Sequence, residues 1–222
     1  MISVIIPAGN PSTLLEVIRE RLAREKNEIE VLIVINTNQE GSILPRYPHE
    51  QILISSKKGR GFSFSKGLQS AKGKISIFLH SDTILPPNWN DIISSTLANS
   101  NTVGGAFSLS FDTDHIYLRL LIFLSDLFFK FTGELWGDRA IFFRTSLLKE
   151  QEFLEVPIME DIKLSNFLKK KGKVVMVKEK VITSSATFIK YGLLRHTYRI
   201  IKCRILYALG GDLSKIYNHY YS

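Results

Sequence analysis

Short apolar segments of β type alternate with helical signals through the first hundred residues of this 222-residue chain. Strands are predicted near residues 2–7, 30–35, 51–55 and 75–79, because each is a short run rich in β-branched side chains. Consecutive parallel strands need a crossover of about a dozen residues, which is usually a helix. The alternation therefore predicts an α/β fold with a doubly wound, mostly parallel sheet.

Helical signals lie between these strands and continue after them. Ser12 or Thr13 can cap a helix that runs to about Lys26, and two more helices are predicted over residues 61–71 and 88–99. The second half is less regular. It contains predicted strands at 103–111 and 140–144, a predicted apolar helix at about 115–131, and a predicted helix from near Met159 to Lys171. No internal repeat or low-complexity linker divides the chain, so one continuous domain is expected.

The cysteine content and the apolar segments indicate in which cellular compartment the protein is expected. The single cysteine, Cys203, excludes an internal disulfide framework and agrees with a reducing cytoplasm. The N-terminal apolar run has no basic region before it and is broken early by Pro7, so no signal peptide is predicted. Charged residues interrupt the apolar stretches 116–131 and 191–209, and neither offers the roughly 18 uncharged residues of a membrane span. We therefore expect a cytoplasmic protein.

Positive charge is concentrated near the C-terminus. The formal net charge is +8, and residues 178–222 hold eight Lys or Arg residues against Glu179 and Asp212, a local balance of +6. Such asymmetry indicates an anionic partner, which could be nucleic acid, acidic lipid or a phosphorylated substrate. Nucleic acid is not expected, because the chain has neither zinc-finger spacing nor an RNA-binding aromatic signature.

The basic tail contains a predicted amphipathic helix from Tyr191 to Gly210. Five residues are spaced for one apolar face: Leu194, Tyr198, Ile201, Ile205 and Leu209. This face could pack onto the domain. Alternatively, it could dock the protein at an anionic bilayer, where buried apolar area and the attraction of Lys and Arg act together. The second interpretation predicts a peripheral contact with the inner face of the membrane.

One predicted strand runs directly into an acidic turn. The segment 74–83 ends in His80, Ser81, Asp82 and Thr83. Ligands of open α/β sheets collect beyond the carboxyl ends of the strands, so Asp82 is a candidate ligand for Mg²⁺ or Mn²⁺. An Asp followed by Thr and two prolines is equally typical of an ordinary turn.

Two further acidic positions could belong to the same site. Asp138 lies in a Trp-Gly-Asp turn, and Glu160 and Asp161 open a predicted helix, where a carboxylate also stabilises the positive helix end. Asp161 precedes Leu164 by three residues and Leu168 by seven, which places it on the apolar side of that helix. A carboxylate directed inward in this way is a candidate catalytic group.

In order and spacing, six segments of the chain resemble the family 2 glycosyltransferases with the GT-A fold, and in particular their small stand-alone bacterial members. The segments are Ser3–Pro7 with Asn10, Lys58–Gly61 with Lys66 and Gly67, Phe78–Thr83, Gly104–Phe107, Gly137–Phe142 and Pro157–Ile162. The resemblance implies three parts: a nucleotide-binding half at residues 1–100, an acceptor-side half at 101–190, and the basic segment 191–222.

The resemblance also assigns roles to single residues. It implies a nucleotide-sugar donor held by Pro7, Gly9, Asn10, Asn36, Arg60, Lys66 and Ser81. His80-Ser81-Asp82 represents the Asp-x-Asp motif of the family, so Asp82 and His80 would bind the Mg²⁺ or Mn²⁺ ion beside the diphosphate. Asp161 matches the base that deprotonates the acceptor hydroxyl for inversion. Trp136, Asp138 and Glu160 would lie on the acceptor side, and the acceptor itself, which could be lipid-linked, is not identified.

Departures from the family pattern leave alternatives open. The second strand is followed by Asn36, Thr37 and Asn38, where the family typically has aspartates that hold uracil and ribose. A sugar-nucleotide-binding protein without turnover is therefore one alternative, and His80 could pack in the core instead of binding metal. A nucleotidyltransferase is another, although Pro7 to Asn10 is a poor match to the Gly-rich, basic signature that it should carry.

Overall fold

The computed structural model describes residues 1–9, 11–149 and 155–221. Within them, the strands form one sheet in the order β3-β2-β1-β4-β7-β6-β8-β5. The first half supplies four mutually parallel neighbours, as predicted. They are β1 (Ile2–Pro7), β2 (Ile29–Asn36), β3 (Glu50–Ser55) and β4 (Ile75–Phe78).

The other half of the sheet is mixed. It consists of β5 (Thr83–Ile84), β6 (Thr102–Phe111), β7 (Ile141–Arg144) and β8 (Lys173–Thr183). Strand β7 is antiparallel to both β4 and β6, whereas β8 runs parallel to β6 and antiparallel to β5. The predicted mostly parallel sheet is therefore confirmed, with an antiparallel strand at its centre. Strand β8 was not predicted, because Lys178, Glu179 and Lys180 interrupt its apolar pattern.

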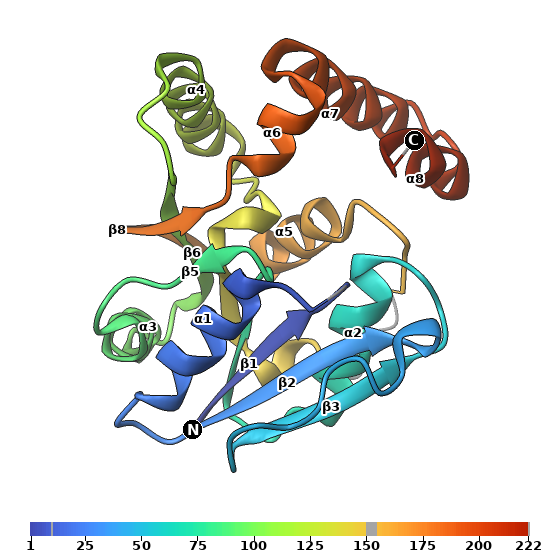
Figure 1. The fold of residues 1–222 in the computed structure, drawn as a ribbon. Helices are drawn as coiled ribbons and strands as arrows, with labels where there is room; N and C mark the ends of the chain where they lie inside the picture. The colour runs from blue at the N-terminus through green and yellow to red at the C-terminus, as the bar shows by residue number, and fades with distance from the viewer. Residues whose placement is uncertain (10, 150–154, 222) are drawn as a thin grey trace.

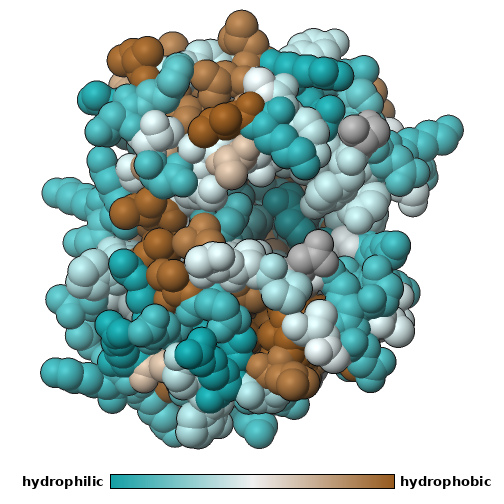
Figure 2. Space-filling view, in the orientation of Figure 1, coloured by the Kyte–Doolittle hydropathy of each residue, from teal (hydrophilic) through white to brown (hydrophobic). Residues whose placement is uncertain are grey.

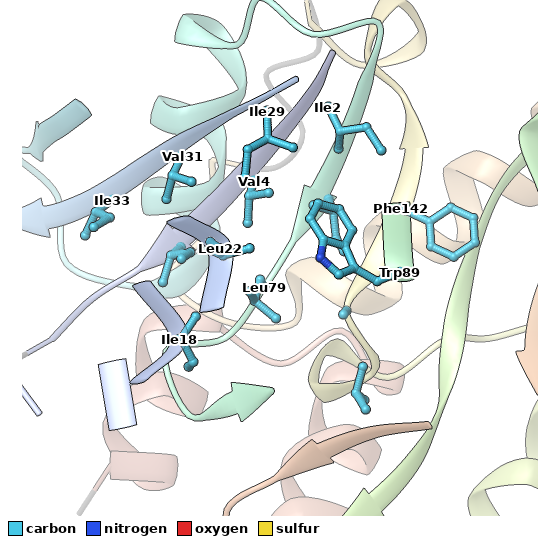
Figure 3. Packing of buried hydrophobic residues seen from close by; sticks show 14 of the residues in the cluster. Ile2, Val4, Ile18, Leu22, Ile29, Val31, Ile33, Leu79, Trp89 and Phe142 are labelled. Atoms are coloured by element: carbon cyan, nitrogen blue, oxygen red, sulfur yellow. The ribbon is translucent and has the colours of Figure 1, made fainter. Parts of the chain in front are cut away.

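Alternate residues of the parallel strands pack on opposite faces of the sheet. Val4 and Ile6 of β1 join one buried cluster, whereas Ile5 joins the other. The first cluster is covered by α1 (Thr13–Ala23) and α3 (Trp89–Ala98), and Figure 3 shows part of it around Leu79 and Trp89. The second is covered by α2 (Arg60–Ser70) and α5 (Glu160–Lys171). Burial on both faces explains why these strands are continuous apolar runs.

The remaining helices gather beyond one end of the sheet (Figure 1). They are α4 (Ile116–Thr132), α6 (Ala186–Tyr191), α7 (Leu193–Ala208) and α8 (Leu213–Tyr221). The predicted tail helix from Tyr191 to Gly210 corresponds to α7, and Gly192 at φ 83° separates it from the shorter α6. Of the described helices, none is long and apolar enough to cross a membrane.

The tail packs with the face opposite to the predicted one. His196 and Cys203 are the buried residues of α7, and Cys203 joins a small cluster with Ile158, Ile162 and Ile216. Leu194 and Leu209, on the predicted apolar face, are 73% and 79% exposed. The interpretation that this face packs onto the domain is therefore wrong. The physical reason is that α5 and α8 already cover the opposite face of α7.

Candidate functional site

A cleft of about 430 Å³ opens beyond the carboxyl ends of β1, β2 and β4. In the space-filling view of Figure 2, the same face is hollowed between its upper and lower parts. Predicted site residues from distant segments meet in the cleft: Pro7, Gly9, Asn36, Arg60, His80, Ser81, Asp82 and Asp138. The structure therefore brings together most of the donor and metal residues named from the sequence. Asn10 lies outside the described residues.

Asp82 follows β4 and faces this cleft. Its backbone carbonyl accepts a hydrogen bond of 3.1 Å from the backbone N–H of Ser184, which fixes the turn against the segment after β8. Burial, followed by the negative charge of Asp138, raises the pKa of the Asp82 carboxyl to about 6. A positive charge close to Asp82 would lower this pKa again, because it favours the ionised carboxylate.

His80 is paired inside the protein. Its Nδ1 atom lies 3.3 Å from Oδ1 of Asp138, while Nε2 is buried with no hydrogen-bond partner among the described residues. A Cβ placed on Gly137 would stand 3.1 Å from Nε2, so glycine at this position lets the backbone approach the imidazole. Burial lowers the pKa of His80 to about 4, so the ring is neutral at pH 7. The structure thus commits Nδ1 to Asp138 and encloses Nε2.

Arg60 is the first residue of α2, and its side chain reaches the inner wall of the cleft. Its Nε atom lies 3.1 Å from Oε1 of Glu160, whose side chain is 3% exposed. Burial lowers the pKa of Arg60, but the charged groups around it, Glu160 foremost, together raise this pKa well above its usual value. Burial in turn raises the pKa of Glu160 to about 7, against the effect of Arg60. Glu160 is therefore the buried partner of Arg60 and does not line the cavities.

A smaller cavity of about 80 Å³ adjoins the cleft and contains the predicted base, Asp161. Its Oδ2 accepts a hydrogen bond of 3.1 Å from the backbone N–H of Gly137, and Oδ1 accepts one of 2.9 Å from that of Ile162. Burial raises the pKa of Asp161, although the charge of Arg60 acts in the opposite direction. Leu164 and Leu168 on the same side of α5 are buried, as the sequence predicts.

The two cavities are connected through shared walls. Arg60, Asp138, Ile200 and Tyr220 line both. Trp136 lines the smaller one, and its ring lies 5.0 Å from the guanidinium carbon of Arg204. The metal and base candidates are therefore in adjoining spaces.

One predicted donor residue is not in this site. Lys66 lines a separate surface hollow together with Lys57, Gln69 and Glu155. It lies on α2 six residues after Arg60, and this offset turns it away from the side of the helix that bears Arg60 and Ser63. The assignment of Lys66 to the donor site is not supported by this placement.

Several cleft residues were not predicted. Phe188 and His196 come from α6 and α7, and Tyr217, Tyr220 and Tyr221 come from α8. The tyrosines of α8 could have been found from the sequence, because the spacing of Leu213, Ile216, Tyr217 and Tyr220 indicates a helix face. Asp212, whose side chain accepts a hydrogen bond from the backbone N–H of Lys215, marks the start of that helix.

The carboxylates of the cleft fit a divalent cation. Mg²⁺ and Mn²⁺ take one or two carboxylates and complete their shells with phosphate and water oxygens. Asp82 and Asp138 face the same cleft, and the charge of Asp138 raises the pKa of Asp82. Within the described residues, no group of three or more His, Cys, Asp or Glu side chains is arranged to hold a metal. An ion between these two aspartates would thus depend on phosphate and water ligands.

The fold is also found in solved structures. The structure of S. aureus TarS residues 1–349 matches 99% of this chain and 70% of its own length, with a TM-score of 0.60 and 14% identity. TarS 1–349 in complex with UDP matches 82% of this chain and 60% of its own, with a TM-score of 0.60 and 17% identity. TarS 1–349 in complex with UDP-GlcNAc matches 82% of this chain and 58% of its own, with a TM-score of 0.60 and 14% identity. The match to a longer TarS structure covers 39% of the length of that protein.

The sequence comparison identifies the family. No curated protein matches the chain. The sequence profile described as Glycosyl transferase family 2 matches residues 3–149, which is more than half of the chain. This range contains all of β1 except Ile2, the strands β2 to β7, the turn with Asp82 and the turn with Asp138. It agrees with the GT-A fold, and it excludes the nucleotidyltransferase alternative. The chain belongs to glycosyl transferase family 2 and is a glycosyltransferase.

Proposed function

We propose that this protein transfers a sugar from a nucleoside-diphosphate sugar to a hydroxyl acceptor, with inversion and with the help of a divalent cation. The observation that carries the proposal is the arrangement of the two cavities. The larger contains Asp82, the smaller contains Asp161, and Arg60 and Asp138 line both. A donor diphosphate and an acceptor hydroxyl could thus meet at the shared wall.

The larger cavity suits an anionic donor. Gly59, Arg60 and Ser63 at the N-terminus of α2 line it. A helix N-terminus presents free backbone N–H groups and a partial positive charge to a phosphate. Asp82 and Asp138 would hold the Mg²⁺ or Mn²⁺ ion, which when bound neutralises the charge of the leaving diphosphate. We leave His80 out of the proposed ligand set, because its Nδ1 lies 3.3 Å from Asp138 and its Nε2 is buried against Gly137.

Asn36 is the proposed contact for the nucleobase. It ends β2 and lines the cleft, at the place where the family typically has an aspartate. An amide side chain can both donate and accept hydrogen bonds, so it can pair with the polar edge of a base. The TarS complexes contain UDP and UDP-GlcNAc. They support uridine as the first nucleoside to test.

Asp161 is the proposed general base. Its carboxylate takes the proton of the acceptor hydroxyl while the hydroxyl oxygen attacks the anomeric carbon, and the bond from that carbon to the diphosphate oxygen breaks. The Gly137 and Ile162 N–H groups fix the orientation of the carboxylate. A raised pKa makes this carboxylate a stronger base than an exposed aspartate, provided that it stays ionised at the working pH.

Calorimetric titration with UDP-, GDP- and dTDP-sugars, each with Mn²⁺ and with excess chelator, tests the donor assignment. We expect one diphosphate sugar to bind, and to bind more weakly with chelator. Release of the nucleoside diphosphate, followed in the presence of candidate acceptors, tests turnover. Binding of a sugar nucleotide without either transfer or hydrolysis would support the alternative of a non-catalytic binding protein.

A further inference from the structure

Helix α4 carries an apolar stripe that the described protein leaves uncovered. Ile116, Leu120, Phe123, Leu124, Leu127 and Phe131 recur at helical spacing, and all are exposed. The exposed fraction reaches 82% for Phe131 at one end and 74% for Ile116 at the other. The stripe thus runs along the whole length of the 17-residue helix.

Helices α6 and α7 present a second such stripe. Ile189, Leu194, Tyr198, Ile201 and Ile205 are between 51% and 73% exposed. The opposite side of α7 contains His196 and Ile200, which line the cleft. The inner side of α7 therefore lines the cleft. Its apolar outer side is not covered by any of the described residues.

The two stripes lie at the same end of the molecule. Figure 1 shows α4 and α6–α7 beyond the same end of the sheet, and Figure 2 shows brown side chains gathered there. The guanidinium of Arg204 on α7 lies 6.0 Å from the ring centroid of Phe128 on α4. Most of the large exposed apolar side chains among the described residues belong to these helices. We call the exposed faces of α4 and α6–α7 the apolar platform.

Positive charges border the platform. Lys190 and Arg195 adjoin the α6–α7 stripe and are exposed, Lys202 adjoins it and is partly exposed, and no Asp or Glu occurs between residues 186 and 209. Two acids near these helices are neutralised inside the protein. Asp126 is paired with Arg139, and Glu134 with Arg204. The rim of the platform is therefore cationic along α6 and α7, whereas the exposed Asp112 and Asp114 precede α4.

We propose that the platform docks on the surface of an anionic lipid bilayer, with α4 and α7 lying in the interface. Interfacial helices combine an apolar face with Lys and Arg beside it, and their long side chains reach the lipid phosphates. A second copy of the chain fits less well, because a symmetric contact would bring two cationic rims together. The charge of the rim thus selects an anionic, apolar partner.

This placement has a consequence for the acceptor, which rests on the proposed function. Helices α6 and α7 separate their part of the platform from the cleft, since Phe188, His196 and Ile200 line the cleft on the inner side of these two helices. A docked enzyme would hold its cleft close to the lipid surface. The acceptor class that fits is a hydroxyl carried by a membrane lipid.

Sedimentation of the full chain with vesicles tests the docking without any turnover. We expect binding to vesicles of phosphatidylcholine with phosphatidylglycerol, much weaker binding to phosphatidylcholine alone, and release as salt screens charges over about 8 Å at physiological ionic strength. Phe131→Gln should weaken binding about tenfold, because a large apolar contact is lost. Leu44→Gln, at a residue 69% exposed elsewhere, is the matched control and should bind as the parent does.

A charge variant tests the rim separately. Replacing Lys190, Arg195 and Lys202 by Gln should reduce binding to the acidic vesicles about a hundredfold at low salt. Replacing Lys26, Lys72 and Lys74 by Gln removes the same charge from the other end of the molecule and should leave binding nearly unchanged. Equal binding to acidic and neutral vesicles, or equal loss in both charge variants, overturns the proposal. The proposal is also overturned if the protein does not bind vesicles but forms a concentration-dependent dimer that Phe131→Gln dissociates. Donor titration without vesicles reports on the proposed function independently.

Discussion

The Nε atom of Arg60 and the Oε1 atom of Glu160 form a buried ion pair of 3.1 Å that joins the N-terminus of α2 to the first residue of α5. Both helices begin at the site, with Arg60 lining the cleft and Asp161 lining the smaller cavity. The pair thus couples the proposed phosphate-binding residue to the helix that carries the proposed base.

Glu160→Gln should destabilise the fold, because it leaves the Arg60 guanidinium without its buried counter-charge. Breaking a fully buried pair by removal of one partner costs about 3–5 kcal/mol, and the loss here should lie below that range because Arg60 is 27% exposed and burial raises the pKa of Glu160 to about 7. Urea denaturation should therefore show a lower free energy of unfolding with an unchanged m-value. Glu155→Gln is the matched control, since its partner Lys57 is 61% exposed and such surface pairs contribute about 0–1 kcal/mol. Similar losses in the two variants would contradict a stabilising role for the buried pair.

Asp82→Asn should weaken the binding of nucleoside diphosphate and of Mn²⁺ together. The two losses are linked because the ion would bridge this carboxylate and the phosphates. Calorimetry should show that chelator lowers the nucleotide affinity of the parent protein and hardly changes that of the variant. Equal nucleotide affinity of the parent with Mn²⁺ and with chelator is the result that would falsify the metal assignment.

The same substitution should stabilise the metal-free protein at neutral pH. The folded state raises the pKa of Asp82 from 3.8 to about 6, so it binds this proton more tightly than the unfolded chain does. Stability therefore falls as pH rises from about 4 to about 6, and the cost persists above that range. In chelator, Asp82→Asn should gain on the order of 1–2 kcal/mol at pH 7 and little at pH 4. Asp114→Asn, at an exposed acid, is the matched control for the change of one charge.

The first half of the fold was predictable because its signals are local. The runs that form β1 to β4 are apolar in sequence, and Ser12 caps α1 with a hydrogen bond of 3.1 Å as predicted. The grouping of Asp82, Asp138 and Asp161 at one end of the sheet was inferred from the resemblance to the family. The structure brings Asp82 and Asp138 into one cleft and Asp161 into the adjoining cavity.

Other features depend on tertiary contacts that no local pattern records. His80 and Asp138 are 58 positions apart in the sequence, so no local pattern predicts that they pair. The sequence therefore could not show that Asp138 competes with a metal ion for His80. Of the two interpretations of the apolar face of α7, packing onto the domain is wrong, because the less regular opposite side, with His196 and Cys203, is the one that packs. Hydrophobic spacing identifies a helix face but not what covers it.

Asp161→Asn should abolish most transfer while leaving donor binding intact. The amide keeps the volume of the side chain, and its oxygen can still accept a hydrogen bond from the Gly137 N–H, but it cannot take a proton. Loss of a general base lowers kcat about a hundredfold to ten-thousandfold. Calorimetric donor affinity should stay nearly unchanged, so the loss belongs to the chemical step. Asp114→Asn serves as the control for a change of one charge.

The pH dependence of transfer provides a second readout of the same residue. The base works only when ionised, and burial raises the pKa of Asp161 above the ordinary value for aspartate. The rate should therefore rise with pH through this raised pKa and then level off, as long as the donor and the ion remain bound. Asp161→Asn should remove this rise from whatever activity remains. If the variant turns over at the parent rate, or keeps the same pH profile, the base is another group and Asp161 only supports the Gly137 turn.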